Sequence, residues 1–433
     1  MAETASPPEE AERADHRGTF ASLRLRNYRL LWLGQTFHAA ALWMEHVARP
    51  WLVLLLTGDD PVHVGGVIAV QMLPQLLFGP WAGVIADWFD RRTILVRTKR
   101  LALVMNCAFA FLLLGGFITL WQVYVFAFLR GALMAFDQPA RQTLIATLVP
   151  SGLLTNAIAL MSSTQNVMRI LGVSIAGALI AVVGVPGAWL AIVAFLVGAV
   201  VATQRIDLLD GTPPGNQGGL RGMGRDLMAG ARFAIRRPEI RGVLLLSFVF
   251  FTFGMAYMQV FLPLFARFQF GIGAPGLSVL SATAAAGALL GALVVATRRP
   301  RRLGAILPVV CAGLGLALVF FAASWSFPRP WDLAFALPLM MVVGVTQTTY
   351  FSLSMSALLA ASPDEMRGRV ISLLSLDRAT TALGSSVAGF TVAALGVQWA
   401  QTIYGTVCVV AGLMVLVFAT RFREFKVAGP RRE

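Results

Sequence analysis

Charged side chains are scarce in this chain of 433 residues, of which 13% are charged and 57% are hydrophobic. A soluble domain averages about 25% charged residues, and a chain this apolar could not cover its surface in water. Apolar runs of about 18 residues or more recur along the sequence, and each is long enough to cross a hydrocarbon core as a helix. The composition therefore excludes a soluble enzyme and predicts an all-α membrane protein.

The sequence also lacks the residues that several kinds of chemistry need. Neither of its two lysines, Lys99 and Lys426, follows a glycine-rich loop, so no site for ATP is expected. The metalloprotease spacing H-E-x-x-H and the hydrolase turn G-x-S-x-G are both missing. We therefore expect no enzyme activity, no cofactor and no metal. The cysteines stand far apart in apolar segments, which indicates packing: they are Cys107, Cys311 and Cys408.

The excess of basic residues, a net charge of +14, lies in alternate loops. Arginines gather at 87–100, 205–241 and 297–303, whereas the intervening loops contain only Arg267 and Arg329. Lys and Arg favour the cytoplasmic side of a membrane. The charge therefore indicates topology rather than nucleic-acid binding, and it predicts a multi-pass protein of the cytoplasmic (inner) membrane with both termini in the cytoplasm.

The apolar runs predict twelve membrane spans in two halves. A polar stretch containing GTPPGNQGG reads as a linker between the halves. The segment 143–160 also matches weakly with a segment 213 residues further on, as expected for a repeated bundle. The predicted parts are a tail at 1–28, a six-helix bundle at 29–206, a linker at 207–240, a second bundle at 241–420 and a tail at 421–433. The predicted spans lie near 29–57, 62–86, 98–118, 121–148, 156–183, 187–206, 242–268, 276–297, 304–324, 331–361, 369–395 and 397–420.

The loop after the second span carries a recognisable motif. It reads Gly83-Val-Ile-Ala-Asp87-Trp-Phe-Asp90-Arg91-Arg92. This resembles the signature loop G-x-x-x-D-[RK]-x-G-[RK]-[RK] of the major facilitator superfamily, with tryptophan in place of the first basic residue and Asp90 in place of glycine. The resemblance implies two pseudo-symmetric six-helix bundles and a gate at this loop. The implied gating residues are Gly83, Asp87, Asp90, Arg91 and Arg92, together with Asp137.

Further segments resemble one branch of that superfamily, the branch of enterobactin-type siderophore exporters and macrolide-efflux proteins. They are RNYRLLWLGQ at 26–35, PWLVLLLTG at 50–58, DQPARQTLIATLVP at 137–150 and PDEMRGRVISL at 363–373. Span five contains Arg169, Gly172 and Gly177 in a sequence that resembles the antiporter motif G-P-x-x-G-G without its proline. Close packing of helices through small residues explains the same glycines equally well.

Ionisable residues inside spans are costly and are candidates for function. Glu45 and Asp137 are the acidic candidates, and we expect them to couple transport to protons. Arg49 stands four residues after Glu45 on the same helix face, so an internal ion pair that eases insertion is an equal alternative. His46, beside Glu45, is a possible relay or a packed side chain. Arg130 falls near the middle of span four.

The resemblance implies that spans one, four, seven and ten line a central cavity. Aromatic, amide and guanidinium groups on these spans suit a small amphipathic organic compound. We expect a monomeric, proton-coupled exporter of such a compound, without ATP. An importer or lysophospholipid flippase of the same fold, a receptor without transport and an intramembrane enzyme remain alternatives. The predicted cavity residues are Arg49, Arg130, Tyr257, Gln259, Gln347 and Tyr350.

Overall fold

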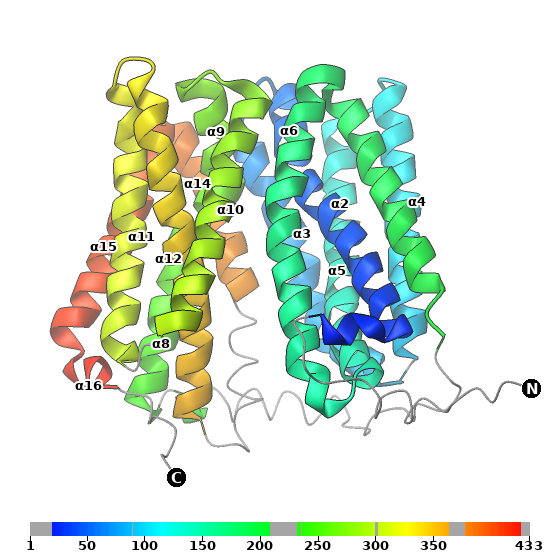
Figure 1. Cartoon of the computed structure of the whole chain (residues 1–433). Helices are drawn as coiled ribbons and strands as arrows, with labels where there is room; N and C mark the ends of the chain where they lie inside the picture. The colour runs from blue at the N-terminus through cyan, green and yellow to red at the C-terminus, as the bar shows by residue number, and fades with distance from the viewer. Residues whose placement is uncertain are drawn as a thin grey trace, which may run out of the picture.

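The described residues of the computed structural model contain only helices and the turns between them (Figure 1). They are residues 20–88, 90–207, 232–234, 236–298, 302–362 and 377–425. Most of the predicted linker and most of each predicted tail lie outside them; residues 20–28 and 421–425 of the tails are described. The N-terminal half contains η1 (Ala21–Arg24), α2 (Arg26–Thr57), α3 (Pro61–Trp88), α4 (Arg91–Leu114), α5 (Leu120–Leu148) and α6 (Ser151–Gln204).

The C-terminal half begins with one span built from several pieces. α8 (Pro238–Val249) continues through three π-helical stretches, η2 (Phe250–Gly254), η3 (Tyr257–Phe261) and η4 (Phe265–Gln269), with α9 (Leu262–Leu264) between the last two. The remaining helices are α10 (Gly273–Arg298), α11 (Leu303–Ala323), α12 (Trp331–Ala361), α14 (Asp377–Leu395), α15 (Val397–Phe418) and α16 (Thr420–Arg423), with the short turn η5 (Ser324–Ser326) after α11.

The helices give the twelve crossings that the sequence predicts. α6 crosses twice because Gly184, with φ of 73° and ψ of −179°, breaks it into two spans. Judged by length and apolar composition alone, eight described helices are able to cross a membrane. α4 and α5 fall short because basic residues, and in α5 also Asp137, interrupt them. In lipid each span must satisfy its own backbone hydrogen bonds, and a helix does so.

The two halves repeat one another along the whole chain. Adding 213 to the bounds of α2, α3, α4 and α5 reproduces, within about four residues, those of the α8 to η4 span, α10, α11 and α12. A close helix crossing repeats at the same interval: Gly131 of α5 packs on the backbone of Gln71 in α3, and Gly344 of α12 packs on the backbone of Ala284 in α10. The fold is therefore two pseudo-symmetric six-helix bundles, as predicted.

The two bundles stand side by side, with the first and last described residues at the same end (Figure 1). We call that end the terminal face; the turns at Ala21, Asp90, Pro150 and Arg302 lie on it. The opposite end, with the turns at Gly58, Gly116, Gly184, Gly271 and Gly396, is the distal face.

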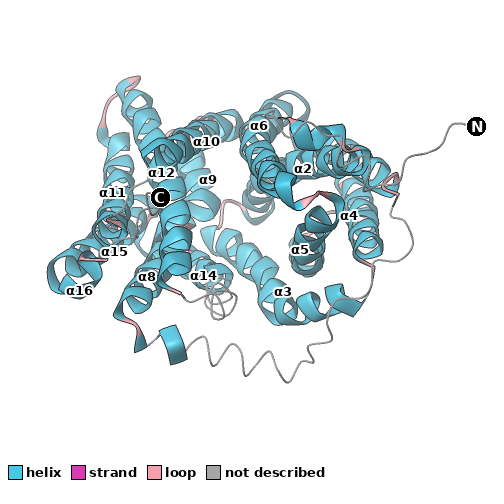
Figure 2. Cartoon of the chain, turned by 60° about the horizontal axis from the view of Figure 1, so that its bottom comes forward, coloured by secondary structure: helices cyan, strands magenta, loops and turns pink. Residues whose placement is uncertain are grey.

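The bundles touch mainly through two helix pairs, α3 with α14 and α6 with α10 (Figure 2). At the first crossing Gly65 lies against Ser385 and Gly389. At the second, Gly177 lies against Ser278. Gly65 and Ser278 stand near the distal ends of their helices, as the helix bounds show. The closest helix crossings between the bundles are thus in the distal half of the molecule.

Candidate functional site

Glu45 lies in the middle of α2 between two arginines. Arg49, one turn later on the same helix, donates to Glu45 Oε1 at 2.6 Å, and Arg130 of α5 donates to Oε2 at 3.1 Å. The side chains are 5% exposed or less. The structure therefore joins the predicted ion pair and the predicted arginine of span four into one buried group with a surplus positive charge.

The surplus charge is only partly compensated. Arg49 Nη1 donates to Gln71 Oε1 at 2.7 Å. Arg49 Nε and Arg130 Nη2 have no hydrogen-bond partner within the part of the chain that the structure describes. Buried donors without partners are unusual, and they mark a place where a further acceptor would be stabilised.

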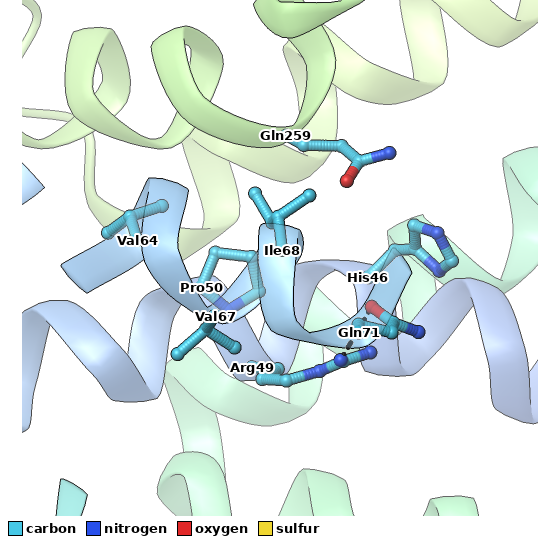
Figure 3. Close-up of a pocket in the computed structure, with 8 residues that line it drawn as sticks. All are labelled: His46, Arg49, Pro50, Val64, Val67, Ile68, Gln71 and Gln259. Atoms are coloured by element: carbon cyan, nitrogen blue, oxygen red, sulfur yellow. Dashed lines mark hydrogen bonds between the residues drawn. The ribbon is translucent and has the colours of Figure 1, made fainter. Parts of the chain in front are cut away.

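A small pocket adjoins this group (Figure 3). His46, Arg49 and Gln71 line one side of it, and Gln259 of the C-terminal bundle reaches it from the other. Its volume of about 20 Å³ is enough for one water molecule. His46 Nδ1 lies 2.8 Å from the backbone carbonyl of Leu42, as expected for a packed histidine.

Asp137 belongs to a second buried group, nearer the terminal face. Arg141 Nε lies 3.6 Å from Asp137 Oδ2, and His38 and Lys99 are close enough to interact with the carboxylate electrostatically. Asp137 Oδ1 and Lys99 Nζ lack hydrogen-bond partners among the described residues. Asp137 therefore has a carboxylate oxygen without a hydrogen bond, whereas both oxygens of Glu45 accept from arginines.

Arg169 of α6 reaches across to the C-terminal bundle. It donates to Gln347 Oε1 at 3.1 Å and points at Met258 Sδ at 3.3 Å. Tyr257 donates to the same Gln347 oxygen at 2.9 Å. Tyr257 and Met258 lie on one of the two π-helical stretches that flank Met255, where the turns are wider than in an α-helix.

Polar residues continue from Arg169 toward the terminal face. Asn166 and Ser162 precede it by three and seven residues, so all three lie on one face of α6. Ser162 and its neighbour Ser163 are exposed although they lie within a membrane span. Since lipid disfavours such a polar stripe, these side chains are candidates for contact with water or with a transported compound.

The glycines after Arg169 have different tasks. A side chain at Gly172 would meet Ala40 O and Trp43 Cβ, each at 2.9 Å, so this glycine lets α6 approach α2. A side chain at Gly177 would collide with Ser278 of the other bundle. Gly177 therefore allows the contact between bundles, whereas Gly172 serves packing within one bundle.

The predicted gating loop is described in part. The side chains of Gly83 and Asp87 lie outside the described residues. Asp90 caps α4 by accepting from the backbone N–H and hydroxyl of Thr93. Partial burial raises the pKa of Asp90, but these bonds outweigh it, and the net pKa is below the ordinary value. Two arginines tie the loop to the N-terminal bundle: Arg91 donates to Thr147 Oγ1 at 3.0 Å, and Arg92 to Gln204 O at 2.8 Å.

Tyr350 lies away from the other predicted cavity residues. It is fully buried, its ring stacks on Phe250 with centroids 3.9 Å apart, and its hydroxyl lies 3.1 Å from Ser247 Oγ. It is part of the core of the C-terminal bundle in this conformation.

Sequence reasoning missed an ion pair between the bundles at the distal face. Arg267 donates to both carboxylate oxygens of Asp59, at 2.9 and 3.0 Å, and its guanidinium lies over the ring of Trp51. The signal was present, because Arg267 is one of only two arginines in the loops of this face. Trp43, which lies 5.1 Å from the Arg169 guanidinium, was also missed, and no sequence pattern marks it.

Comparisons with known proteins agree with this architecture. The staphyloferrin A transporter of Staphylococcus aureus is 24% identical over 404 residues, which cover 89% of this chain and 94% of that protein. Macrolide efflux protein A of Streptococcus pyogenes is 26% identical over 285 residues, covering 61% and 65%.

Solved structures share the fold. The nucleoside transporter NupG superposes with a TM-score of 0.73 at 13% identity, covering 90% of this chain and 99% of that one. A bacterial homologue of the iron transporter ferroportin, in an inward-facing state, gives 0.69 at 15% identity, covering 92% and 99%. A family model described as "Transmembrane secretion effector" matches residues 17–430. The chain therefore belongs to the transmembrane secretion effector family of major facilitator superfamily transporters, and it is not an enzyme.

Proposed function

We propose that the protein exports a small amphipathic organic compound in exchange for protons, by alternating access between its two bundles. The observation that carries this proposal is the buried group of Glu45, Arg49 and Arg130. A carboxylate between two cations in the middle of a span is costly to keep and is functional by default. The names of the relatives, a siderophore transporter and a macrolide efflux protein, support a compound of this size and polarity.

In this proposal two carboxylates take up the proton in turn. Asp137, with one free oxygen, receives a proton from the terminal side first. Glu45 is neutralised only when one of its arginines turns to another acceptor, because protonation would otherwise leave two buried cations unpaired. A bound anion is such an acceptor, and this links proton transfer to substrate binding.

We base export, rather than import, on the macrolide efflux protein among the relatives. Ser162 and Asn166 extend from Arg169 toward the terminal face along α6. The loops of this face carry most of the arginines, which favours placing it, with both termini, in the cytoplasm. An exporter loads its compound from the cytosol, so in this proposal the compound would pass Ser162 and Asn166 on its way to Arg169.

Everted membrane vesicles with an acidic lumen provide the test. They are offered a siderophore, a macrolide, a tetracycline and a lysolipid in turn, and we expect at least one to accumulate in the lumen while the pH gradient lasts. Glu45→Gln should abolish accumulation, whereas Glu239→Gln, a change at the start of α8 on the terminal face, should not. Normal accumulation by Glu45→Gln would rule out its coupling role. Gradient-driven loss from preloaded vesicles would instead indicate an importer.

The loop from Gly83 to Arg92 is the proposed cytosolic gate. Arg91 and Arg92 fix it to the N-terminal bundle, and Asp87 is the residue that the family pattern assigns to the lock between bundles. Asp87→Asn should slow exchange between the two open states. Single-molecule distance measurements across the terminal face would detect this, and unchanged exchange rates would count against a gate here.

A further inference from the structure

Arg169 is a cation in a membrane span that has no carboxylate partner. Within the described part of the chain, every ion pair involves other residues, and the groups that Arg169 contacts are all neutral: the Gln347 amide oxygen, the Met258 thioether and the Tyr257 hydroxyl. A thioether is a weak acceptor and a neutral amide gains less from a cation than a carboxylate does. The position is therefore underpaired for its depth in the membrane.

The amide oxygen of Gln347 accepts the hydrogen bonds that an anionic oxygen would accept at this position. It accepts from the Arg169 guanidinium at 3.1 Å and from the Tyr257 hydroxyl at 2.9 Å. One sp² oxygen that accepts from a guanidinium and a phenol has the arrangement of one carboxylate oxygen, and a carboxylate would form the same two bonds more strongly.

The surroundings suit the apolar part of a ligand. The indole of Trp43 lies 5.1 Å from the guanidinium, and the thioethers of Met255 and Met258 lie beside Gln347 and Arg169. Tryptophan and methionine adapt to flat apolar groups. These contacts come from both bundles, so a ligand here would touch each of them. Ser162 and Asn166 continue the polar face of α6 from Arg169 toward the terminal face.

We propose that Arg169 and Tyr257 bind a carboxylate of the transported compound, and that Gln347 substitutes for it when the site is empty. The substrate class is an amphipathic organic acid with an apolar body. The proposal rests on the proposed transport function and assigns to Arg169 a role beyond helix packing. It also links to the group at Glu45, because an acid brings a negative charge into a region with surplus arginine.

Matched acid and alcohol ligands test the charge requirement. Purified full-length protein in lipid nanodiscs is titrated with pyrenebutyric acid and pyrenebutanol, and separately with naphthylacetic acid and naphthylethanol, with tryptophan fluorescence as the readout. We expect the wild type to bind each acid about tenfold or more tightly than its alcohol, since hydrogen bonds to charged groups have this strength. Equal affinity within both pairs, or no binding of either acid, overturns the proposal.

Substitution then locates the preference. Arg169→Gln should weaken acid binding by about tenfold or more and leave alcohol binding unchanged. The control Arg237→Gln removes an exposed arginine that lies over Phe233 outside the cavity, and it should change neither affinity. If Arg169→Gln reduces both affinities equally, the residue is structural and the proposal fails.

A second variant covers poor folding. Should Arg169→Gln not give folded protein by thermal melting, Arg169→Lys keeps the charge but loses the planar fork, and it should weaken acid binding severalfold with alcohol binding unchanged. Undiminished acid binding by the lysine variant overturns the proposal. Flux of the same acids in proteoliposomes separates the two claims: preference for the acid without flux removes the transport proposal only, and flux without preference removes this one only.

Discussion

The two bundles share one fold, yet their interiors differ in chemistry. The N-terminal bundle buries Glu45 with Arg49 and Arg130, and further buries Asp137 near Lys99. In the described interior of the C-terminal bundle the buried polar groups are hydroxyls, thiols and the amide of Gln401, and the buried carboxylate of Asp332 lies at the distal start of α12. The residues 213 positions after Glu45, Arg49, Arg130, Asp137 and Lys99 are Met258, Leu262, Val343, Tyr350 and Ala312.

This difference indicates a division of labour. Helix lengths and crossings are shared, because the glycines at 131 and 344 allow the same close contact in each half. Buried charge, in contrast, is expensive in lipid and persists only where it is used. We infer that the N-terminal bundle handles the proton and the charge of the substrate, while the C-terminal bundle supplies apolar contacts and moves against it.

The largest expected effect comes from removing the central carboxylate. Glu45→Gln leaves two buried arginines without a counter-ion, and breaking a buried pair in this way costs about 3–5 kcal/mol. Arg130→Met should cost less, because the pair of Glu45 and Arg49 remains neutral. The counterpart change Met258→Leu conserves volume and should cost under about 1.5 kcal/mol. Thermal unfolding in detergent measures the order, and equal losses for Glu45→Gln and Arg130→Met would contradict a surplus of positive charge.

The next prediction compares the loss of stability on changing Asp137 with the loss on changing its counterpart, Tyr350. Asp137→Asn removes the carboxylate near Lys99 and Arg141 and should cost about 1.5–3 kcal/mol. Tyr350→Phe removes one neutral hydrogen bond, to Ser247, and should cost about 0.5–1.5 kcal/mol. Unfolding scans compare the two variants, and proton-driven accumulation should fall only in the first. If Tyr350→Phe abolished coupling and Asp137→Asn did not, the division of labour would be reversed.

Much of the fold could be predicted, because a bilayer restricts the length of each span and the side on which arginines lie. Span length, the alternation of arginines and the repeat at 213 residues led to twelve helices in two bundles, which the structure contains. The break inside α6 at Gly184 was predicted as two separate spans because a glycine and a proline stand together there. The π-helical stretches around Tyr257 were not predictable, since they depend on how neighbouring helices pack and not on local propensity.

The candidate site was predictable only where spacing within one helix decides contact. Glu45 and Arg49 are four residues apart, so their pairing follows from helix geometry. The contact of Arg169 with Gln347 joins residues 178 positions apart, and it depends on the placement of two bundles. For the same reason Tyr350, predicted to line the cavity, lies inside the C-terminal bundle. Small rotations of a helix decide such outcomes.

A smaller effect concerns the ion pair that joins the bundles at the distal face. Asp59→Asn weakens its link to Arg267, and a partly exposed pair contributes about 0.2–1 kcal/mol. The population of the conformation that is open at the distal face should therefore increase a few times. Spin labels at Trp121→Cys and Trp331→Cys, in a background without the native cysteines, would report a longer distance.

The matched control for the distal pair is Asp332→Asn. Asp332 lies 3.8 Å from Arg329, within one bundle, so its loss should leave the distance between bundles unchanged. If both variants lengthened the distance alike, the effect would be general loosening of the distal turns rather than release of a contact between bundles.

A last comparison of the bundles concerns the start of their third helices. α4 has Asp90 as a cap, whereas α11 follows Arg302, which forms no side-chain cap bond. Asp90→Ala should therefore cost about 1 kcal/mol, and Arg302→Ala close to nothing. Because the folded pKa of Asp90 is lowered, its contribution is complete above the ordinary pKa of 3.8 and disappears as the pH falls through the lowered value. Unfolding scans should give a constant difference between wild type and Asp90→Ala from about pH 5 to 8 and a shrinking one in stronger acid. A difference that grew on acidification would mean that the cap is not the source of the stabilisation.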